Sequence, residues 1–169
     1  DENGKLVWSQ TAYAFLDQDA PDTANPSLWR DTQLNHIYGL FEVTDGIYQV
    51  RGYDMSNVTF IKGDTGWIVV DPLMSVECAQ AALALVEENL GTFPVKAVIY
   101  SHSHVDHFGG VKGIVSEEEV QAGNVQVIAP EGFEKHAVSE NIYAGTAMGR
   151  RASYQYGTCL LYTSDAADD

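Results

Sequence analysis

Residues 96–110 read KAVIYSHSHVDHFGG, an apolar run followed at once by four side chains that can bind a metal ion. The run is short, β-branched and aromatic, which predicts a buried strand over residues 96–101. The chain therefore leaves a strand and enters a loop where His102, His104, Asp106 and His107 follow. Imidazole and carboxylate are ligands that suit zinc. This stretch thus predicts a metal site at the end of a strand.

The spacing of these four residues indicates two metal positions. In an extended chain, side chains two residues apart point the same way, so His102 and His104 can hold one ion. Asp106 and His107 follow one bend later and can reach a second ion. The alternative is a polar loop with unrelated histidines, but three of the chain's five histidines fall within this hexad. No cysteine lies nearby, which favours an open catalytic site over a closed structural zinc site.

The hexad over residues 102–107 resembles the His-x-His-x-Asp-His signature of the metallo-β-lactamase superfamily. By itself this signature indicates only the superfamily, which includes lactamases, glyoxalase II-type thioesterases and nucleases. Flanking blocks narrow the match, because they are similar to the alkylsulfatase branch of dodecyl-sulfate hydrolases. The blocks are ANPSLWR (24–30), GIYQVRGYD (46–54), GWIVVDP (66–72), GGVKG (109–113) and the stretch over residues 140–154. The resemblance thus covers most of the chain.

The resemblance implies an α/β fold, namely a metallo-β-lactamase-like αββα sandwich of which this chain holds only the N-terminal half. It also implies a zinc-dependent hydrolase that converts alkyl sulfate and water to alcohol and sulfate, and a homodimer for the full-length parent. In this interpretation His102 and His104 hold one zinc ion, and Asp106 and His107 hold a second. The two ions together activate water for ester cleavage, so Asp106 and His107 are also the expected catalytic residues.

Asp71 directly follows the strand predicted over residues 66–70. The resemblance implies that its carboxylate lies beneath the metal loop and supports it. Such a hydrogen-bonding partner fixes the orientation and the tautomer of a metal ligand. The alternative is that Asp71 and Pro72 only open a turn.

Arg150 and Arg151, together with Tyr143, form a second candidate site. A sulfate ester is an anion, and the planar guanidinium group presents a fork of donors that matches its oxygens. Tyrosine can add a hydroxyl group. These three residues are therefore predicted to bind substrate, the alternative being an ordinary charged helix face.

Composition restricts the other classes of function. A net charge of −15 repels phosphate backbones, so nucleic acid is not an expected partner and the nuclease branch is disfavoured. No apolar run reaches the length of about 18 residues that a membrane span needs. Cys78 is the only cysteine outside the C-terminal tail, so no intrachain disulfide is expected. The resemblance implies a periplasmic or secreted location, while the composition also leaves a cytoplasmic one open.

The pattern divides the chain into three parts. Residues 1–35 are polar and mixed, which predicts an N-terminal arm with one short helix, and residues 36–158 form the N-terminal part of the predicted catalytic domain. Strand and helix patterns alternate there, as in α/β proteins. The expected strands cover residues 46–51, 57–62, 66–70, 96–101 and 125–129, and the expected helices cover residues 76–90, a short stretch from 109, residues 116–122 and parts of 131–154.

Residues 159–169 read CLLYTSDAADD and do not resemble the family. They are similar to the translation of a transposase adapter used in sequencing libraries, so we expect a non-native tail rather than a natural acidic one. The chain is then a fragment that lacks later metal ligands, and alone it is expected to be poorly folded, to bind zinc weakly and to show no turnover. Two alternative functions stay open: another hydrolase of the superfamily, such as a lactamase or thioesterase, and a non-catalytic metal-binding module.

Overall fold

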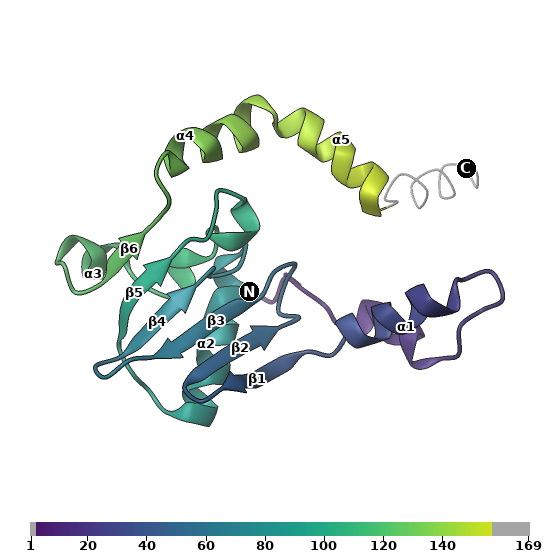
Figure 1. The fold of residues 1–169 in the computed structure, drawn as a ribbon, viewed down its shortest axis with the longest axis horizontal. Helices are drawn as coiled ribbons and strands as arrows, with labels where there is room; N and C mark the ends of the chain where they lie inside the picture. Colours follow the sequence, from purple (N-terminus) through teal and green to yellow (C-terminus); the bar gives the residue numbers. More distant parts are fainter. Residues whose placement is uncertain (1–2, 157–169) are drawn as a thin grey trace. The chain divides into compact units, whose positions relative to one another are not determined.

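The computed structural model describes residues 3–156, which fall into two compact units (Figure 1). The first unit extends to Pro130 and the second begins at Glu131, and each is described here by itself. The predicted tail over residues 159–169 lies outside the described residues.

A six-stranded sheet forms the body of the first unit, with its strands side by side in chain order. The strands are β1 (Gly39–Thr44), β2 (Ile47–Arg51), β3 (Val58–Lys62), β4 (Trp67–Val70), β5 (Val95–Ile99) and β6 (Gln126–Ile128). The first four pair antiparallel, whereas β5 and β6 add parallel to β4. Because parallel strands end at the same edge of a sheet, the carboxyl ends of β4, β5 and β6 lie together, and this edge carries the candidate site.

One face of the sheet is covered by α2 (Val76–Leu90), which Figure 1 shows behind the strands. Four helix side chains are buried: Cys78, Ala79, Ala82 and Val86. Paired positions on the strands supply buried partners on one face: Val50, Val58, Phe60, Val69 and Val98. Burying each large apolar side chain contributes about 1.5–3 kcal/mol relative to its exposure, so this layer is the core. The helix predicted over residues 76–90 is confirmed at both ends.

Ser75 caps the N-terminus of α2, and its Oγ accepts a hydrogen bond from the N–H of Cys78 at 3.2 Å. Replacing Ser75 by Ala removes this acceptor, so we expect the free energy of unfolding to fall by about 1 kcal/mol. Urea unfolding of a longer protein that contains this chain, with and without Ser75→Ala, measures the loss. The Ser75→Asp variant restores a capping oxygen and is expected to recover most of it, whereas equal losses in both variants would contradict the capping role.

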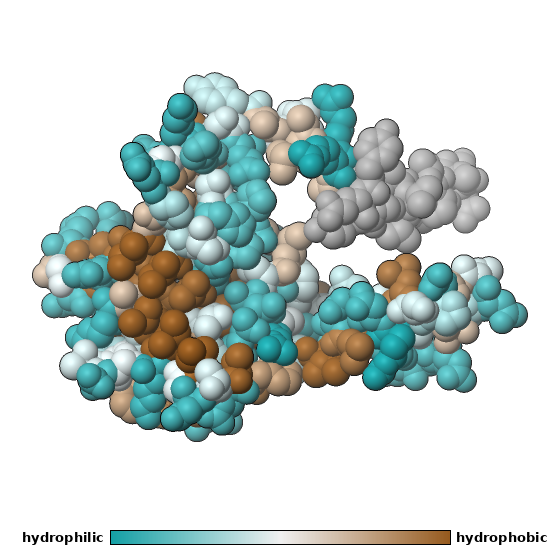
Figure 2. Space-filling view, viewed as in Figure 1, coloured by the Kyte–Doolittle hydropathy of each residue, from teal (hydrophilic) through white to brown (hydrophobic). Residues whose placement is uncertain are grey.

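The opposite face of the sheet is apolar and only partly covered. The register pairs Ile61 with Ile68, Val70 with Ile99, and Ile99 with Ile128, so these side chains share that face. Ile128 is 46% exposed, and Figure 2 shows a hydrophobic patch over this side of the sheet. Apolar side chains on both faces are typical of a layered fold in which a further layer covers the second face. This arrangement agrees with the predicted sandwich, of which residues 3–156 contain one sheet.

The structure differs from the predicted elements near the N-terminus. The arm contains two helical segments, the 3₁₀ helix η1 (Thr11–Asp17) and α1 (Pro26–Asn35), where one short helix was expected. Asn25 caps α1, because its side chain accepts from the N–H groups of Ser27 and Leu28. β1 was not predicted. It lies at the edge of the sheet, and its last three residues (42–44) are exposed, which weakens the alternation of apolar and polar residues.

Short helical elements complete both units. In the first unit they are η2 (Val105–His107), η3 (Val111–Gly113) and α3 (Glu117–Gln121). The described part of the second unit contains α4 (Phe133–Val138), the π-helical turn η4 (Ser139–Tyr143) and α5 (Gly145–Tyr156), in agreement with the helical pattern predicted there. Among the described helices, none combines the length and the hydropathy that a membrane span requires.

Candidate metal centre

Two parallel strands bring the candidate ligands to one place. The register pairs Val70 of β4 with Ile99 of β5, and the N–H of Asp71 donates to the carbonyl of Ile99 at 3.0 Å. Asp71 therefore follows β4 at the same edge where residues 101–107, which we term the histidine loop, follow β5. The crossover through α2 makes these strands parallel, so residues distant in sequence meet here.

The carboxylate of Asp71 is held by three hydrogen bonds. Its Oδ1 accepts from the N–H of Ser101 at 2.8 Å, and its Oδ2 accepts from the Ser101 hydroxyl at 2.6 Å. The same Oδ2 lies 2.9 Å from Nδ1 of His107. Asp71 has a φ of +56°, a left-handed conformation that costs a non-glycine residue about 1–3 kcal/mol and persists where the surroundings hold it. The strained residue is thus the one that points its carboxylate at the histidine loop.

The ring of His107 lies between two carboxylates. Its Nδ1 faces Asp71, and its Nε2 lies 3.2 Å from Oδ2 of Asp106. When Nδ1 donates its proton to Asp71, the neutral ring keeps the Nε2 lone pair for a metal ion. Two ligand atoms bound to one zinc ion at about 2.0–2.2 Å in tetrahedral geometry lie about 3.4 Å apart. His107 and Asp106 can therefore bind one ion with little rearrangement.

His102 is oriented through Ser101, whose Oγ lies 2.8 Å from its Nδ1. Because the single hydroxyl proton is donated to Asp71, the oxygen accepts from the Nδ1–H of His102, and Nε2 of His102 stays available. The ring centroid of His102 lies 4.6 Å from that of His104 and 4.1 Å from that of His107. The three imidazoles of the hexad are therefore adjacent.

The structure brings His102 and His107 to Asp71, while His104 lies next to His102 and Asp106 next to His107. Ligand atoms of Asp71, His102 and His107 all lie within 4.8 Å of one another, which marks a possible metal-binding triad. The separate roles of these side chains, as ligands or as support, stay predictions. Sequence reasoning missed Ser101, which contacts both Asp71 and His102. Its position directly before the hexad was the available signal, but a single serine gives no indication of its partners.

Gly109 and Gly110 let the chain pass against the turn that follows β4. A Cβ atom on Gly109 would lie 2.3 Å from the carbonyl oxygen of Met74, and one on Gly110 would lie 2.3 Å from that of Pro72. The N–H of Gly110 also donates to the carbonyl of Leu73 at 2.9 Å. The two glycines thus allow a tight backbone passage, which fixes the histidine loop against the segment that carries Asp71.

A cleft of about 410 Å³ borders the cluster. Its volume falls in the range of about 300–1,000 Å³ that is usual for small-molecule sites. Polar and apolar side chains both line it: Gln49, Met55, Ser56, Asn57, Thr59, Val70, Asp71, Asp106 and His107. A molecule in this cleft would contact the two residues predicted to be catalytic.

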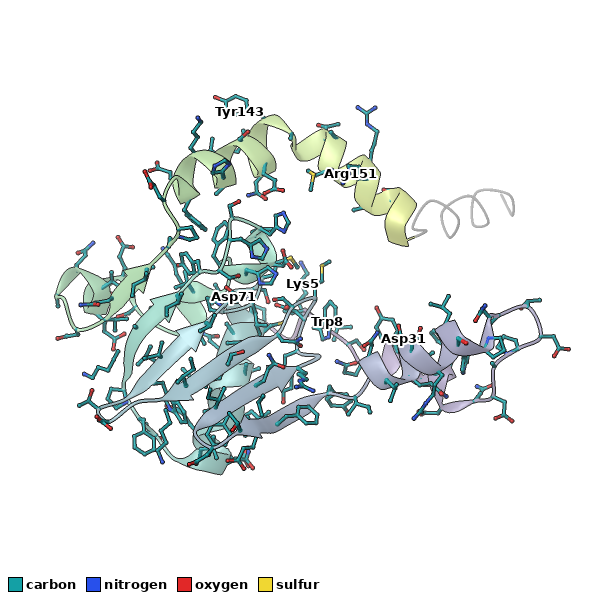
Figure 3. The ribbon with its side chains drawn as sticks, viewed as in Figure 1. Lys5, Trp8, Asp31, Asp71, Tyr143 and Arg151 are labelled. Carbon is teal, nitrogen blue, oxygen red and sulfur yellow. The ribbon has the colours of Figure 1, made fainter. Side chains whose placement is uncertain are left out.

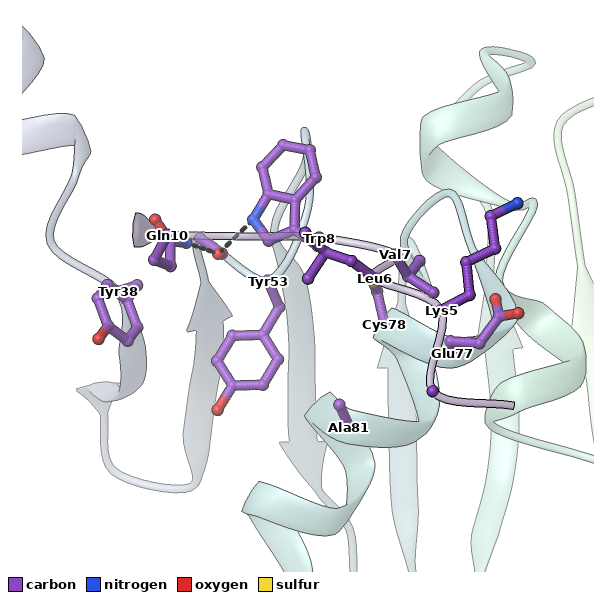
Figure 4. Close-up of a pocket in the computed structure, with 12 residues that line it drawn as sticks. Lys5, Leu6, Val7, Trp8, Gln10, Tyr38, Tyr53, Glu77, Cys78 and Ala81 are labelled. Carbon is purple, nitrogen blue, oxygen red and sulfur yellow. Dashed lines mark hydrogen bonds between the residues drawn. The ribbon is translucent and has the colours of Figure 1, made fainter. Parts of the chain in front are cut away.

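A second cavity, of about 510 Å³, lies between the N-terminal segment and α2 (Figure 4). The side chains of Trp8 and Gln10 both donate to the carbonyl of Gly52 at its border. Cys78 also lines it, and burial raises the pKa of this thiol, which keeps the sulfur protonated at neutral pH. The cavity contains none of the candidate ligands, so we assign the chemistry to the smaller cleft.

The predicted substrate contacts Tyr143, Arg150 and Arg151 belong to the second unit. Tyr143 is 84% exposed, and both arginines are exposed. Figure 3 shows Tyr143 extending outward from its helical segment. Their part in sulfate binding stays a prediction.

Comparison with known proteins begins with the family model of the metallo-beta-lactamase superfamily, which matches residues 51–163. The match contains β3 to β6, the turn at Asp71 and the whole histidine loop. It covers more than half of the chain.

Curated relatives are similar over nearly the whole chain. A linear primary-alkylsulfatase of Pseudomonas sp. is 57% identical over 94% of this chain and 24% of its own length. An (R)-specific secondary-alkylsulfatase of Pseudomonas sp. is 57% identical over 98% of this chain, and an alkyl/aryl-sulfatase of Saccharomyces cerevisiae is 53% identical over 94%, with 25% of each relative covered. The solved structure of a stereoselective inverting sec-alkylsulfatase from Pseudomonas sp. matches with a TM-score of 0.84 and 56% identity, over 92% of this chain and 25% of that one. The chain thus spans about a quarter of the length of the curated relatives it matches.

Proposed function

The chain belongs to the metallo-beta-lactamase superfamily, and from this premise we propose that a protein carrying it, together with the remaining length of its relatives, hydrolyses alkyl sulfate esters. The reaction takes an alkyl sulfate and water to an alcohol and sulfate. The observation that carries the proposal is the identity of 53–57% with three proteins named as alkylsulfatases, over at least 94% of this chain. The cluster at the ends of β4 and β5 supplies the chemistry that such a reaction needs.

We propose two zinc ions as cofactors, with His102 and His104 holding one and Asp106 and His107 the other. The geometry supports the pairing of Asp106 with His107, because Nε2 of His107 and Oδ2 of Asp106 lie 3.2 Å apart, close to the separation of two ligand atoms on one zinc ion. Zinc bound there would polarise the ester and lower the pKa of a water molecule toward neutrality. Nitrogen and oxygen donors without cysteine suit an open, catalytic site.

The chain's own residues orient this chemistry. Asp71 accepts the Nδ1 proton of His107 and, through the Ser101 hydroxyl, fixes the ring of His102, so both rings keep their tautomers during turnover. The cleft beside Asp106 and His107 would receive the ester.

The anionic sulfate group needs cationic partners, since the chain itself carries a net charge of −15. We propose that Arg150 and Arg151 provide them, with the Tyr143 hydroxyl as an additional donor. This part of the proposal rests on the chemistry of the three side chains and on the family pattern around them.

The substrate class can be tested with a panel of dodecyl sulfate, a β-lactam and a thioester. Each is supplied to the 169-residue chain and to the longer protein, by which we mean one that carries this chain and the remaining length of its relatives. We expect the longer protein to release sulfate from dodecyl sulfate, and removal of metal by a chelator to lower the rate by at least about 100-fold, with recovery on adding zinc. The 169-residue chain alone is expected to bind zinc weakly and to release no sulfate.

Two outcomes would contradict these expectations. Turnover of the β-lactam or the thioester without release of sulfate would favour another hydrolase of the superfamily. Full activity and two tightly bound zinc ions in the 169-residue chain would contradict the expectation that further ligands are required.

A further inference from the structure

We propose that Asp54 is a positioning residue of the metal centre, because it holds the two chain segments that carry Asp71 and Asp106. The proposal rests on the metal-dependent function proposed above and deepens it. Asp54 lies in the loop between β2 and β3, outside the histidine loop and outside the predicted ligand set. It is the last residue of the family-like block 46–54, but no sequence feature assigns it a role in the site.

Asp54 is a buried carboxylate whose two oxygens both accept main-chain hydrogen bonds. It is 6% exposed. Its Oδ2 accepts from the N–H of Met74 at 2.8 Å, and its Oδ1 accepts from the N–H of Ser56 at 3.0 Å. Burying a carboxylate is costly unless such bonds compensate, so the side chain is held in one orientation.

The bond to Met74 fixes the segment that presents Asp71. Within that segment Asp71 and Leu73 have φ values of +56° and +63°, so two non-glycine residues adopt the left-handed conformation almost in succession. For a bulky residue such as Leu73 this is a genuine outlier, which persists only where neighbouring contacts fix it. The hydrogen bonds that flank Leu73 are those of Met74 with Asp54 and of Gly110 with the Leu73 carbonyl.

Ser56, which Asp54 holds by the second hydrogen bond, contacts the segment that carries Asp106. Ser56 is 7% exposed, and its hydroxyl donates to the main-chain carbonyl of Asp106. The side chain of Asp106 lies against Nε2 of His107, while Asp71 lies against Nδ1. Asp54 and Ser56 therefore join, through main-chain contacts, the two carboxylates that lie on either side of the His107 ring.

A positioning role makes a different prediction from a merely structural one. Asp54→Asn keeps the size of the side chain but turns an amide N–H₂ toward either the N–H of Met74 or that of Ser56, so one bond becomes a clash of donors. Ser56→Ala removes only the contact with Asp106, and Ser56→Thr keeps the hydroxyl. Ser116→Ala serves as a control, since it breaks the capping box of α3, whose residues lie outside the cleft and the metal cluster.

The test measures cobalt and zinc binding by the longer protein, using competition with a chelating dye and the absorption spectrum of the cobalt form. We expect Asp54→Asn and Ser56→Ala to weaken binding by about 10–100-fold and to change the cobalt spectrum, as loss of supporting hydrogen bonds around a metal does. Ser56→Thr should restore both readouts. Ser116→Ala should lower the melting temperature but leave both unchanged.

A metal-free readout accompanies this test. Hydrogen exchange at the Met74 amide is expected to be faster in Asp54→Asn than in the parent protein, because its acceptor is lost. Unchanged metal affinity and cobalt spectrum in both Asp54→Asn and Ser56→Ala would overturn the inference. A parent protein that binds cobalt and responds to these variants, but hydrolyses no alkyl sulfate, would reject only the proposed substrate.

Discussion

Alanine in place of His102 or Asp106 is expected to lower alkyl sulfate hydrolysis by at least about a thousandfold in a protein that carries the full length of the relatives. Each substitution removes one proposed ligand from a cluster in which the imidazole rings of the hexad are adjacent and Asp106 lies 3.2 Å from His107. The measurement is kcat/KM for dodecyl sulfate together with the zinc content of each purified variant. We expect zinc content to fall along with activity.

His136→Ala is the matched control, because it makes the same chemical change on an exposed side chain of α4, outside the histidine loop. It is expected to leave zinc content and turnover unchanged. Near-normal turnover in both His102→Ala and Asp106→Ala would refute the proposed metal centre. A parent protein that loses zinc in both variants but never hydrolyses any ester would instead support the non-catalytic metal-binding module.

Much of the metal centre follows from local sequence. An apolar run that ends at a histidine-rich loop predicts ligands at a strand end, and the family resemblance implied that Asp71, which follows another strand, lies beneath that loop. Both features depend on short segments whose pattern is strong. The parallel pairing of β4 and β5 through α2 then determines that the two segments meet, and that pairing follows from the strand–helix–strand order.

The support around the centre could not be predicted in the same way. Ser56 contacts Asp106 across 50 positions of sequence, and Asp54 contacts Met74 across 20. Neither residue belongs to a spacing pattern in the sequence. Their contacts could not be predicted because they depend on how separate loops pack after the sheet has formed. Local pattern predicts elements and residue types, while the partners of a single buried carboxylate depend on tertiary structure.

The start of α1 carries a sequence signal from which this helix could have been predicted. Asn25 followed by Pro26 is a typical helix start, with a capping side chain and a proline in the first turn, and α1 begins there. β1 is different, because its edge position leaves residues 42–44 exposed and weakens the alternation on which strand prediction relies.

Gly110→Ala is expected to destabilise a protein that carries the full length of the relatives by about 3 kcal/mol, a large part of the 5–15 kcal/mol that is typical of a folded domain. The reason is space and not backbone conformation, since φ at Gly110 is −84° and any residue can adopt that value. An added Cβ would lie 2.3 Å from the carbonyl oxygen of Pro72 and 2.6 Å from that of Ser75. Both neighbours are main-chain atoms, so neither can rotate away as a flexible side chain would.

Urea unfolding, followed by tryptophan fluorescence, measures this effect, with Gly149→Ala as the matched control. Gly149 lies inside α5 with nothing within 4 Å of an added Cβ, so alanine there is expected to stabilise the helix by about 0.5–1 kcal/mol. The two substitutions are chemically identical and should therefore act in opposite directions. If Gly110→Ala left the unfolding midpoint unchanged, the main chain at Gly110 could not pass as close to the Pro72 carbonyl as the structure has it, and the contact of Asp71 with His107 would lose part of its structural basis.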